Sequence, residues 1–247
     1  MPNIPTALTD QARPGAISRI ARQAQLSDEI ADHIRHQIMT GQIRSGEFLR
    51  LERFAEELGV SVTPVREAMF KLRGDGFVSL AARRGFRVSP LTADDVRDVY
   101  FVQAKLAGEL ARRSCAAMTP DRIEVLRDLH EQFKRAIADG ERETVTRVNH
   151  TFHREINILA NSPKLAWFLE NALTYSPHVY FDQIPGWTEL ALETQPRLIE
   201  ILANKDSRGI VRELDKYLTT AGDLLIQYLD GLGIWDESAP GDVAAAP

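Results

Sequence analysis

The chain has 247 residues, 44% hydrophobic and 26% charged, with a net charge of −5, the balance of a water-soluble globular protein long enough for two domains. No apolar stretch approaches the roughly 20 residues of a membrane-spanning helix, and the proline-interrupted N-terminus lacks the apolar core of a signal peptide. The single cysteine, Cys115, excludes an intramolecular disulfide framework and a multi-cysteine zinc site, so we expect a cytoplasmic protein with no membrane partner.

The charge is unevenly distributed along the chain. Residues 1–26 carry +2, residues 27–90 carry +1 and residues 91–247 carry −8. The acidity therefore belongs to the second half. Any contact with a polyanion such as DNA is expected in the first 90 residues, through cations gathered on one face.

The first elements are an arm and a helix. Residues 1–25 are interpreted as a flexible N-terminal arm, and Ser27 is expected to cap a helix that runs to about Thr40. Ile30, Ile34 and Ile38 recur at the spacing of one helix face, which predicts that this face is buried.

The next segment predicts a helix-turn-helix motif. Leu51–Leu58 has the apolar spacing of a short helix, and Gly59 can make the tight turn that follows. Ser61 or Thr63 can cap a second helix with Pro64 in its first position, because a missing N–H costs nothing there. The second helix of such a motif presents its N-terminal side chains to the DNA major groove. The alternative is an ordinary helical hairpin in a core.

A basic hairpin follows the second helix. Residues 74–76 end that helix, and residues 77–80 and 86–88 are predicted strands. The tip, Ala81–Gly85, carries Arg83 and Arg84 beside a glycine that allows close backbone approach. A solvated charged hairpin is a reasonable interpretation of this segment alone. Two helices and a basic hairpin in this order favour a winged helix whose wing contacts phosphates or the minor groove.

Residues 26–90 resemble the GntR winged helix in the order and spacing of many residues. The shared positions are Ile43–Gly46, Phe48-Leu49, Phe54-Ala55, Leu58-Gly59-Val60-Ser61, Thr63-Pro64-Val65-Arg66-Glu67-Ala68, Asp75-Gly76-Phe77-Val78, Gly85 and Val88. The resemblance implies a bacterial transcriptional regulator that binds a palindromic double-stranded DNA operator as a homodimer.

The resemblance also implies DNA contacts. Thr63, Arg66 and Gly85 match contact positions of the family, and Ser61 is an acceptable equivalent. Val62 and Glu52 stand where the family usually or often has arginine. A valine can touch a thymine methyl group whereas arginine favours guanine, so we expect a shifted operator sequence. The full predicted DNA-contact set is Arg50, Arg53, Ser61, Val62, Thr63, Arg66, Arg83, Arg84 and Gly85.

Residues 91–235 are predicted to form an all-helical effector-binding and dimerisation domain. Thr92 and Asp95 form a near capping box at its start, and Thr119-Pro120 is a cap and first-position pair. The predicted helices are Thr92–Ala117, Asp121–Asp139, Glu141–Ala160, Lys164–Tyr175, Thr188–Ala203 and Ser207–Leu229, with a connection at Pro177–Pro185. Pro196 is expected to kink or restart the fifth helix, and residues 236–247 to be disordered. The fold class is therefore mainly α, a winged helix followed by an antiparallel helical bundle.

The most suggestive cluster in the bundle is Asn149, His150, Phe152 and His153, because residues four apart share a helix face. A single histidine on such a face is commonly a hydrogen-bonded core residue. The second half is similar to the FCD effector domain of FadR-type regulators at Asn149-x-x-Phe152-His153-Arg154-x-Ile156-Asn157, Asn161-Ser162-Pro163-x-Leu165 and Ile199, Leu202 and Asp206.

In many such domains an aspartate and three histidines bind a divalent metal that holds a carboxylate effector. Those positions fall on Asn149, His153, Gln195 and Tyr217, so one ligand of four remains. Neutral amides and a phenol are poor ligands for a transition metal. We therefore expect no tightly bound metal and no cofactor. With Gln103, where the family often has arginine, these four residues are the predicted pocket for a small organic metabolite.

Three functions remain open from the sequence. The first is a ligand-responsive regulator, which in this family is most often a repressor. The second is a DNA-binding dimer whose bundle binds no effector. The third is a helical-bundle enzyme with His153 as general base, for which the sequence offers no nucleophile–base pair, phosphate-binding loop or metal set.

Overall fold

The computed structural model describes residues 14–82, 84–175 and 183–234. The chain divides between Pro90 and Leu91 into two compact units, which are described separately. In the described ranges, no helix combines the length and apolar character needed to cross a membrane. The expected disordered tail, residues 236–247, and the first 13 residues of the expected arm lie outside the described residues.

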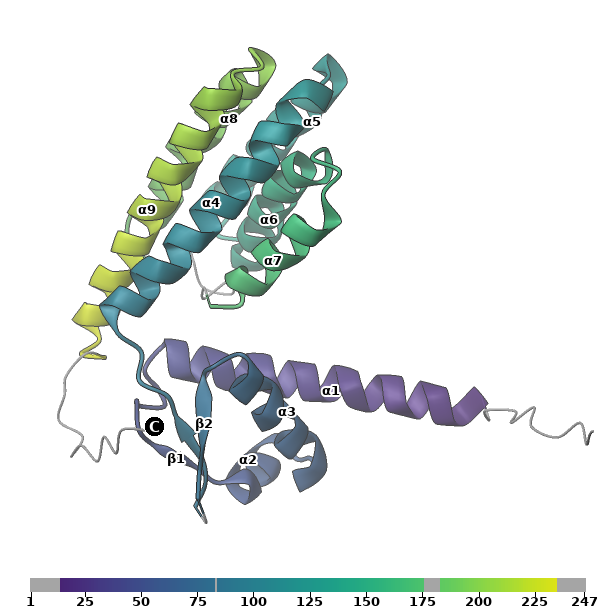
Figure 1. Ribbon diagram of the computed structural model, residues 1–247, viewed down its shortest axis with the longest axis vertical. Helices are drawn as coiled ribbons and strands as arrows, with labels where there is room; N and C mark the ends of the chain where they lie inside the picture. The colour runs from purple at the N-terminus through teal and green to yellow at the C-terminus, as the bar shows by residue number, and fades with distance from the viewer. Residues whose placement is uncertain (1–13, 83, 176–182, 235–247) are drawn as a thin grey trace, which may run out of the picture. The chain divides into compact units, whose positions relative to one another are not determined.

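The first unit combines three helices with a small sheet (Figure 1). Its elements are α1 (Pro14–Met39), β1 (Phe48–Leu49), α2 (Leu51–Leu58), α3 (Val62–Gly74), β2 (Val78–Ala81) and β3 (Gly85–Val88). The strands are antiparallel in the order β1-β3-β2. The predicted helix at 51–58 is confirmed to the residue, and the predicted hairpin is present. The strand β1 was not predicted.

Apolar side chains hold α3 against α1. Ile30, Ile34 and Ile38 of α1 are buried, as their spacing predicts. On α3 the side chains of Val65, Ala68, Met69 and Leu72 have no exposed surface. Because one face of α3 is completely buried, the opposite face is held in a fixed orientation toward solvent.

The helix α1 begins earlier than predicted. It starts at Pro14, so the expected arm is wrong over residues 14–25. Ser27 is buried inside the helix, where its hydroxyl donates to the carbonyl of Ala24. Residues 15–26 are rich in alanine, arginine and glutamine, which favour helix. Two side-chain hydrogen bonds also link α1 to α3. Gln23 of α1 donates to Glu67 of α3 at 2.8 Å, and Lys71 of α3 donates to Ser27 of α1 at 2.9 Å.

The second unit is a bundle of helices (Figure 1). Its described helices are α4 (Ala93–Ala117), α5 (Pro120–Ala138), α6 (Arg142–Ile158), α7 (Pro163–Leu173), α8 (Trp187–Ala203) and α9 (Ser207–Gly231). The capping box of Thr92 and Asp95 is confirmed, as is the cap by Thr119, whose hydroxyl accepts from the N–H of Arg122. The predicted helices agree with the observed ones to within a few residues.

The helix α8 runs through Pro196 without the expected restart. Proline removes only the hydrogen bond to the carbonyl four residues earlier. Pro196 lies on the exposed face, where water can solvate that carbonyl. On the opposite face the buried Gln195, Leu198 and Leu202 hold the helix in the bundle.

Large side chains fill the bundle core. Phe133, Phe152 and Trp187 are almost completely buried, and the rings of Phe133 and Trp187 meet edge to face at 6.4 Å. Cys115 is also buried among these side chains as a free thiol. Helices α4 and α9 approach closely at Gly222, where an added Cβ would stand 2.9 Å from Cγ of Tyr100.

We predict that Gly222→Ala destabilises the second unit by about 1–3 kcal/mol, because the base of the Tyr100 ring cannot move without shifting α4 or α9. Urea unfolding followed by tryptophan fluorescence measures this, since all three tryptophans lie after residue 90. Gly231→Ala is the matched control on the same helix, where an added Cβ meets nothing within 4 Å. Equal stability of the two variants would contradict the close contact.

Candidate functional site

The exposed face of α3 is the candidate DNA-reading surface. Ser61, Thr63 and Arg66 are exposed and Val62 is half-buried, all in the first turns of the helix. Ser61 occupies the N-cap position, but its hydroxyl makes no cap hydrogen bond. Pro64 is the third helical residue and is buried, so the expectation that it opens the helix is wrong.

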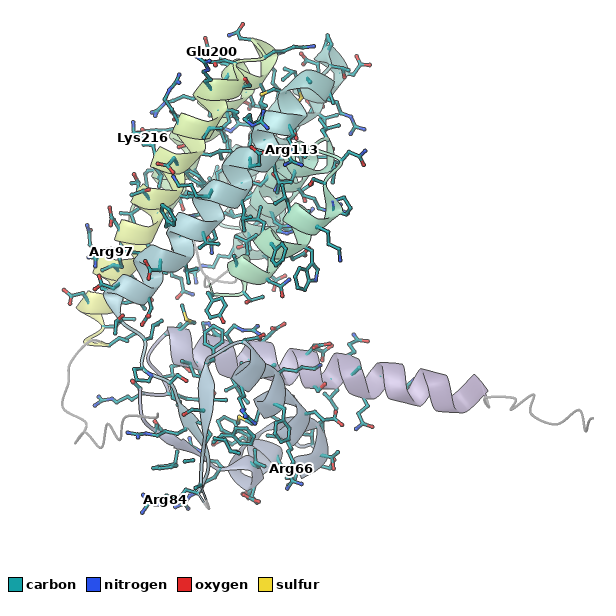
Figure 2. The ribbon with its side chains drawn as sticks, viewed as in Figure 1. Arg66, Arg84, Arg97, Arg113, Glu200 and Lys216 are labelled. Carbon is teal, nitrogen blue, oxygen red and sulfur yellow. The ribbon has the colours of Figure 1, made fainter. Side chains whose placement is uncertain are left out.

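Arg66 is available for a DNA contact. Its side chain is exposed and makes no ion pair or hydrogen bond with the described part of the chain. A guanidinium in this state presents its five N–H donors to solvent, in a geometry that matches guanine or phosphate. Figure 2 shows Arg66 and Arg84 at the same end of the first unit.

The hairpin carries the second group of cations. Arg84 is exposed and lies over the Phe48 ring, with 5.7 Å between the guanidinium carbon and the ring centroid. This cation–π contact holds the side chain beside β1 without neutralising its charge. Gly85 has φ of +84°, a conformation that side chains disfavour, and it begins β3. Arg83 lies outside the described residues.

Arg87 was missed by the sequence analysis. Its Nε donates to the Gly46 carbonyl at 2.8 Å, and its guanidinium also lies over Phe48, at 5.8 Å. Arg87 therefore holds the base of the hairpin against the segment before α2. The only sequence signal was its alternation with the buried Phe86 and Val88 on a predicted strand.

The predicted DNA contacts at α2 are two arginines, and one of them already forms an ion pair within the helix. Arg53 pairs with Glu57 one turn later, with 2.7 Å between Nε and Oε1. Glu52 and Glu56 are also exposed on this helix. Exposed pairs of this kind contribute little to stability, so a phosphate can replace Glu57 at small cost. Arg50 is exposed at the N-cap position of α2, where the helix N-terminus also favours an anion.

In the second unit a buried amide connects three helices. Gln195 of α8 is 1% exposed, and its Nε2 donates to Oδ1 of Asn149 on α6 at 3.1 Å. Its Oε1 lies 2.9 Å from Nδ1 of His130 on α5. Asn149 and Gln195, two residues of the predicted pocket, are thus hydrogen-bonded to each other. His130 adds a third side chain to this network.

The other two residues that the FCD resemblance indicated form an aromatic pair. The rings of His153 on α6 and Tyr217 on α9 are stacked, with centroids 5.7 Å apart and planes inclined by 20°. Burial lowers the pKa of His153 to about 4, with a smaller contribution from His150. Burial also raises the pKa of Tyr217. Both rings are therefore uncharged at neutral pH.

Gln103, also a predicted pocket residue, makes a hydrogen bond between two helices. It is 1% exposed, and its Nε2 donates to the carbonyl of Ala172 at 2.9 Å, which joins α4 to α7. This hydrogen bond uses one N–H donor of the amide to hold α4 and α7 together.

His130 was not predicted, although a signal exists. Leu126, His130 and Phe133 follow the i, i+4, i+7 spacing of one helix face, and both apolar members are buried. A histidine on a buried face requires a hydrogen-bond partner. That spacing places His130 in the bundle but does not identify Gln195 as its partner.

The donor chemistry of the four positions is one imidazole, two amides and a phenol. Among the described residues no group of three or more His, Cys, Asp or Glu side chains is placed to hold a metal ion. The Asn149 oxygen already accepts a hydrogen bond, and the Tyr217 phenol holds its proton tightly. One imidazole with such neighbours is a poor site for a transition metal, which requires deprotonated or strongly basic ligands.

Comparisons with known proteins agree with this two-part organisation. Residues 26–88 match the family described as bacterial regulatory proteins, gntR family, and residues 98–220 match the FCD domain. The Escherichia coli HTH-type transcriptional regulator McbR is 26% identical over 76% of this chain and 87% of its own. A probable D-xylose utilization operon transcriptional repressor from Paenarthrobacter nicotinovorans is 29% identical over 62% and 68%.

A solved structure of E. coli McbR/YncC resembles this fold, with a TM-score of 0.63 at 25% identity. The likeness covers 82% of this chain and 97% of that one.

We predict that Arg66→Ala weakens binding to a preferred DNA sequence by about 1–3 kcal/mol and relaxes selectivity at one base pair. The physical reason is the loss of a guanidinium that has no competing partner within residues 14–82, 84–175 and 183–234. Fluorescence anisotropy with DNA selected from a randomised pool measures both effects. Arg73→Ala removes the same charge from the C-terminal end of α3 and should cost much less.

For Arg84→Ala we expect a more uniform loss across DNA sequences. If Arg84 meets a phosphate, the plot of log affinity against log salt concentration becomes flatter by about one unit. Titrations at several salt concentrations measure the slope. An unchanged slope would show that the hairpin does not contact the DNA backbone.

The burial of His153 predicts a pH-dependent stability. Its folded pKa of about 4 lies below the usual 6.5, so between these values the unfolded chain binds a proton that the folded chain does not. Stability is therefore lost as the pH falls, by about 1.4 kcal/mol one unit below the unfolded pKa. Urea unfolding at about pH 7.5 and 5.5 should show this loss in the wild type, and a smaller one in His153→Gln. His150→Gln removes only the smaller contribution and should keep most of the loss.

Proposed function

Because the chain belongs to the GntR family of DNA-binding transcriptional regulators and carries an FCD domain, we propose that it binds a palindromic operator as a homodimer under the control of a small metabolite. Two observations support this proposal: Arg66 on α3 is exposed and has no partner among the described residues, and the bundle contains a hydrogen-bonded cluster of Asn149, Gln195 and His130. A cytoplasmic location follows from an operator as its partner.

The matched families and the relatives are transcriptional regulators, so the chain is a regulator and not an enzyme. The hypothesis of His153 as a general base is set aside. Its pKa of about 4 would also make it a weak base at neutral pH. Within the regulator class we propose repression, supported by the relative that is described as a probable operon repressor.

We propose that α3 and the hairpin make the main DNA contacts. Arg50, at the N-cap of α2, and Arg53, within α2, would contact the phosphate backbone of the DNA. Val62 lies half-buried at the first position of α3. Its methyl groups suit a thymine methyl, whereas an arginine there would suit guanine. This substitution supports an operator that differs from those of relatives with arginine at this position.

Homodimerisation is supported by large apolar side chains exposed on two neighbouring helices of the bundle. Phe101 on α4 is 60% exposed, and Trp167 and Phe168 on α7 are 56% and 53% exposed. The helices α4 and α7 contact each other within the unit. Exposed aromatic side chains gathered in this way mark protein interfaces. We propose a second copy of the chain as the partner, because a palindromic operator requires two recognition helices.

The control proposed is allosteric. An effector that contacts Asn149 of α6, Gln195 of α8 and Tyr217 of α9 would bias how these helices pack. If the bundles of two chains pair, such a change alters the distance between their recognition helices and so the affinity for DNA. We propose that no tightly bound metal takes part, because the donor set suits hydrogen bonding to an organic ligand.

DNA selection tests the proposed function. The purified full-length protein should enrich a palindromic sequence from a randomised pool and bind it with a steep salt dependence. A shift in operator affinity by a metabolite supports the effector proposal. Operator binding that no metabolite changes, with no thermal stabilisation by any of them, would favour the alternative of a dimer without effector. Absence of salt-dependent DNA binding would contradict the proposal as a whole.

We predict that Phe101→Asp combined with Trp167→Asp makes the protein monomeric, because it places charges on the proposed interface. Light scattering after size exclusion measures the mass, and anisotropy the loss of operator affinity. Val125→Asp is the matched control, since Val125 is an exposed apolar residue on α5 at 39% exposure. A double variant that remains dimeric would place the interface elsewhere.

A further inference from the structure

The hydrogen bonds of Gln195 determine which atoms of the cluster are still available. Its Nε2 donates to Asn149 and its Oε1 faces Nδ1 of His130. An amide oxygen can only accept, so Nδ1 of His130 carries a hydrogen. Asn149 uses its oxygen in this network. Its Nδ2 group keeps two N–H donors that no other described residue accepts.

The aromatic pair is also without hydrogen-bond partners. Within the described chain, no hydrogen bond reaches the ring nitrogens of His153 or the hydroxyl of Tyr217. Tyr217 is 6% exposed and Asn149 is 8% exposed. None of these unused groups is among the fully enclosed unpaired atoms of the described residues, so solvent can reach them although the residues are largely buried. Three side chains with accessible, unused donors and acceptors therefore offer a place for a polar ligand.

No lysine or arginine of the described chain shifts the pKa of either ring. Burial sets the pKa of both rings, and the further contributions come from His150 on His153 and from Tyr100 on Tyr217. Neither a lysine nor an arginine is among these groups. Of the cations on α8 and α9, Arg197 pairs with Glu193 and Glu213, and Lys216 is exposed at the outer edge of the bundle (Figure 2).

A carboxylate does not suit this site. Burying a charge requires a partner of opposite charge or a metal. Of the four positions that match metal ligands in the FCD resemblance, two are amides (Asn149 and Gln195), one is a phenol (Tyr217) and one is a histidine (His153). The available hydrogen-bonding groups are the N–H donors of Asn149 and the imidazole and hydroxyl groups of His153 and Tyr217, which can both donate and accept. Hydroxyl groups match this set, because each can donate and accept.

We propose that the site between α6, α8 and α9 binds an uncharged polyhydroxylated compound, a sugar or a polyol, directly and without a metal. This inference rests on the effector-binding function proposed above and specifies the class of its ligand. The hydroxyls would pair with Asn149 Nδ2, the Tyr217 hydroxyl and the His153 imidazole. The edges of the stacked rings supply an apolar surface for the C–H groups of the ligand.

Matched pairs of compounds test the charge. Thermal stability of the full-length protein is measured with D-xylose, D-glucose, D-galactose and xylitol, and with xylonate, gluconate and galactonate, in zinc and in chelator. At least one neutral compound should stabilise the protein, its acid should not, and chelator should change nothing. Stabilisation by the acids alone, a requirement for zinc, or no stabilisation by any neutral compound would each overturn the proposal.

Variants locate the binding. Tyr217→Phe removes only a hydroxyl, and Asn149→Ala removes the free N–H donors; each should weaken binding of the stabilising sugar at least tenfold in calorimetry. Arg147→Ala, on an exposed position of α6, is the control. Unchanged affinity in both variants would overturn the site. Operator binding is measured in parallel: its absence counts against the proposed function, whereas intact operator binding without any sugar response counts against this inference alone.

A gain of metal tests whether the four positions converge. The combined change Asn149→Asp, Gln195→His and Tyr217→His, with His153 retained, restores a set of one carboxylate and three imidazoles. About one zinc per chain is then expected by mass spectrometry, against none in the wild type. Circular dichroism checks that the variant folds. Zinc in the wild type, or a folded variant without zinc, would contradict the geometry.

Discussion

The buried amide of Gln195 is the interaction on which the second unit depends. It is 1% exposed and uses its nitrogen toward α6 and its oxygen toward α5. An apolar replacement would leave Asn149 and His130 unmatched inside the bundle, which costs more than the amide pair contributes. The same hydrogen bond determines what Asn149 can bind, because it occupies the amide oxygen and leaves the amide N–H groups for a ligand. Protein hydrogen bonds thus connect two of the positions that a metal connects in related domains.

Much of the fold was predictable because its signals are local. The helix α2 and the caps at Thr92 and Thr119 follow from spacing and from side chains a few residues apart. The strand β1 escaped prediction because two residues carry no periodicity, and it exists by pairing Phe48 with Arg87 across the chain. The continuity of α8 through Pro196 is likewise decided by packing rather than by the residues alone.

The candidate sites divide in the same way. Sequence order was enough to place Ser61, Thr63 and Arg66 on the exposed face of α3, since the buried face of that helix is readable from its apolar residues. It was not enough for His130, whose partner lies 65 residues away, or for Gln103, which joins α4 to α7. Hydrogen bonds between distant helices depend on which way each side chain points, and helical periodicity carries no information on that.

The two departures from the family pattern have the same physical character. In the first unit, Val62 replaces a cation at the start of α3. In the second, Asn149, Gln195 and Tyr217 replace charged or metal-binding groups. Each change removes a strong electrostatic attraction to one kind of partner, a guanine edge or a divalent ion. What remains is shape, methyl contact and neutral hydrogen bonding, which discriminate by leaving a wrong partner's polar groups unmatched. We therefore propose that selectivity in both units rests on shape, methyl contact and neutral hydrogen bonds together with base reading by Arg66, while Arg84 supplies a general attraction to the DNA backbone.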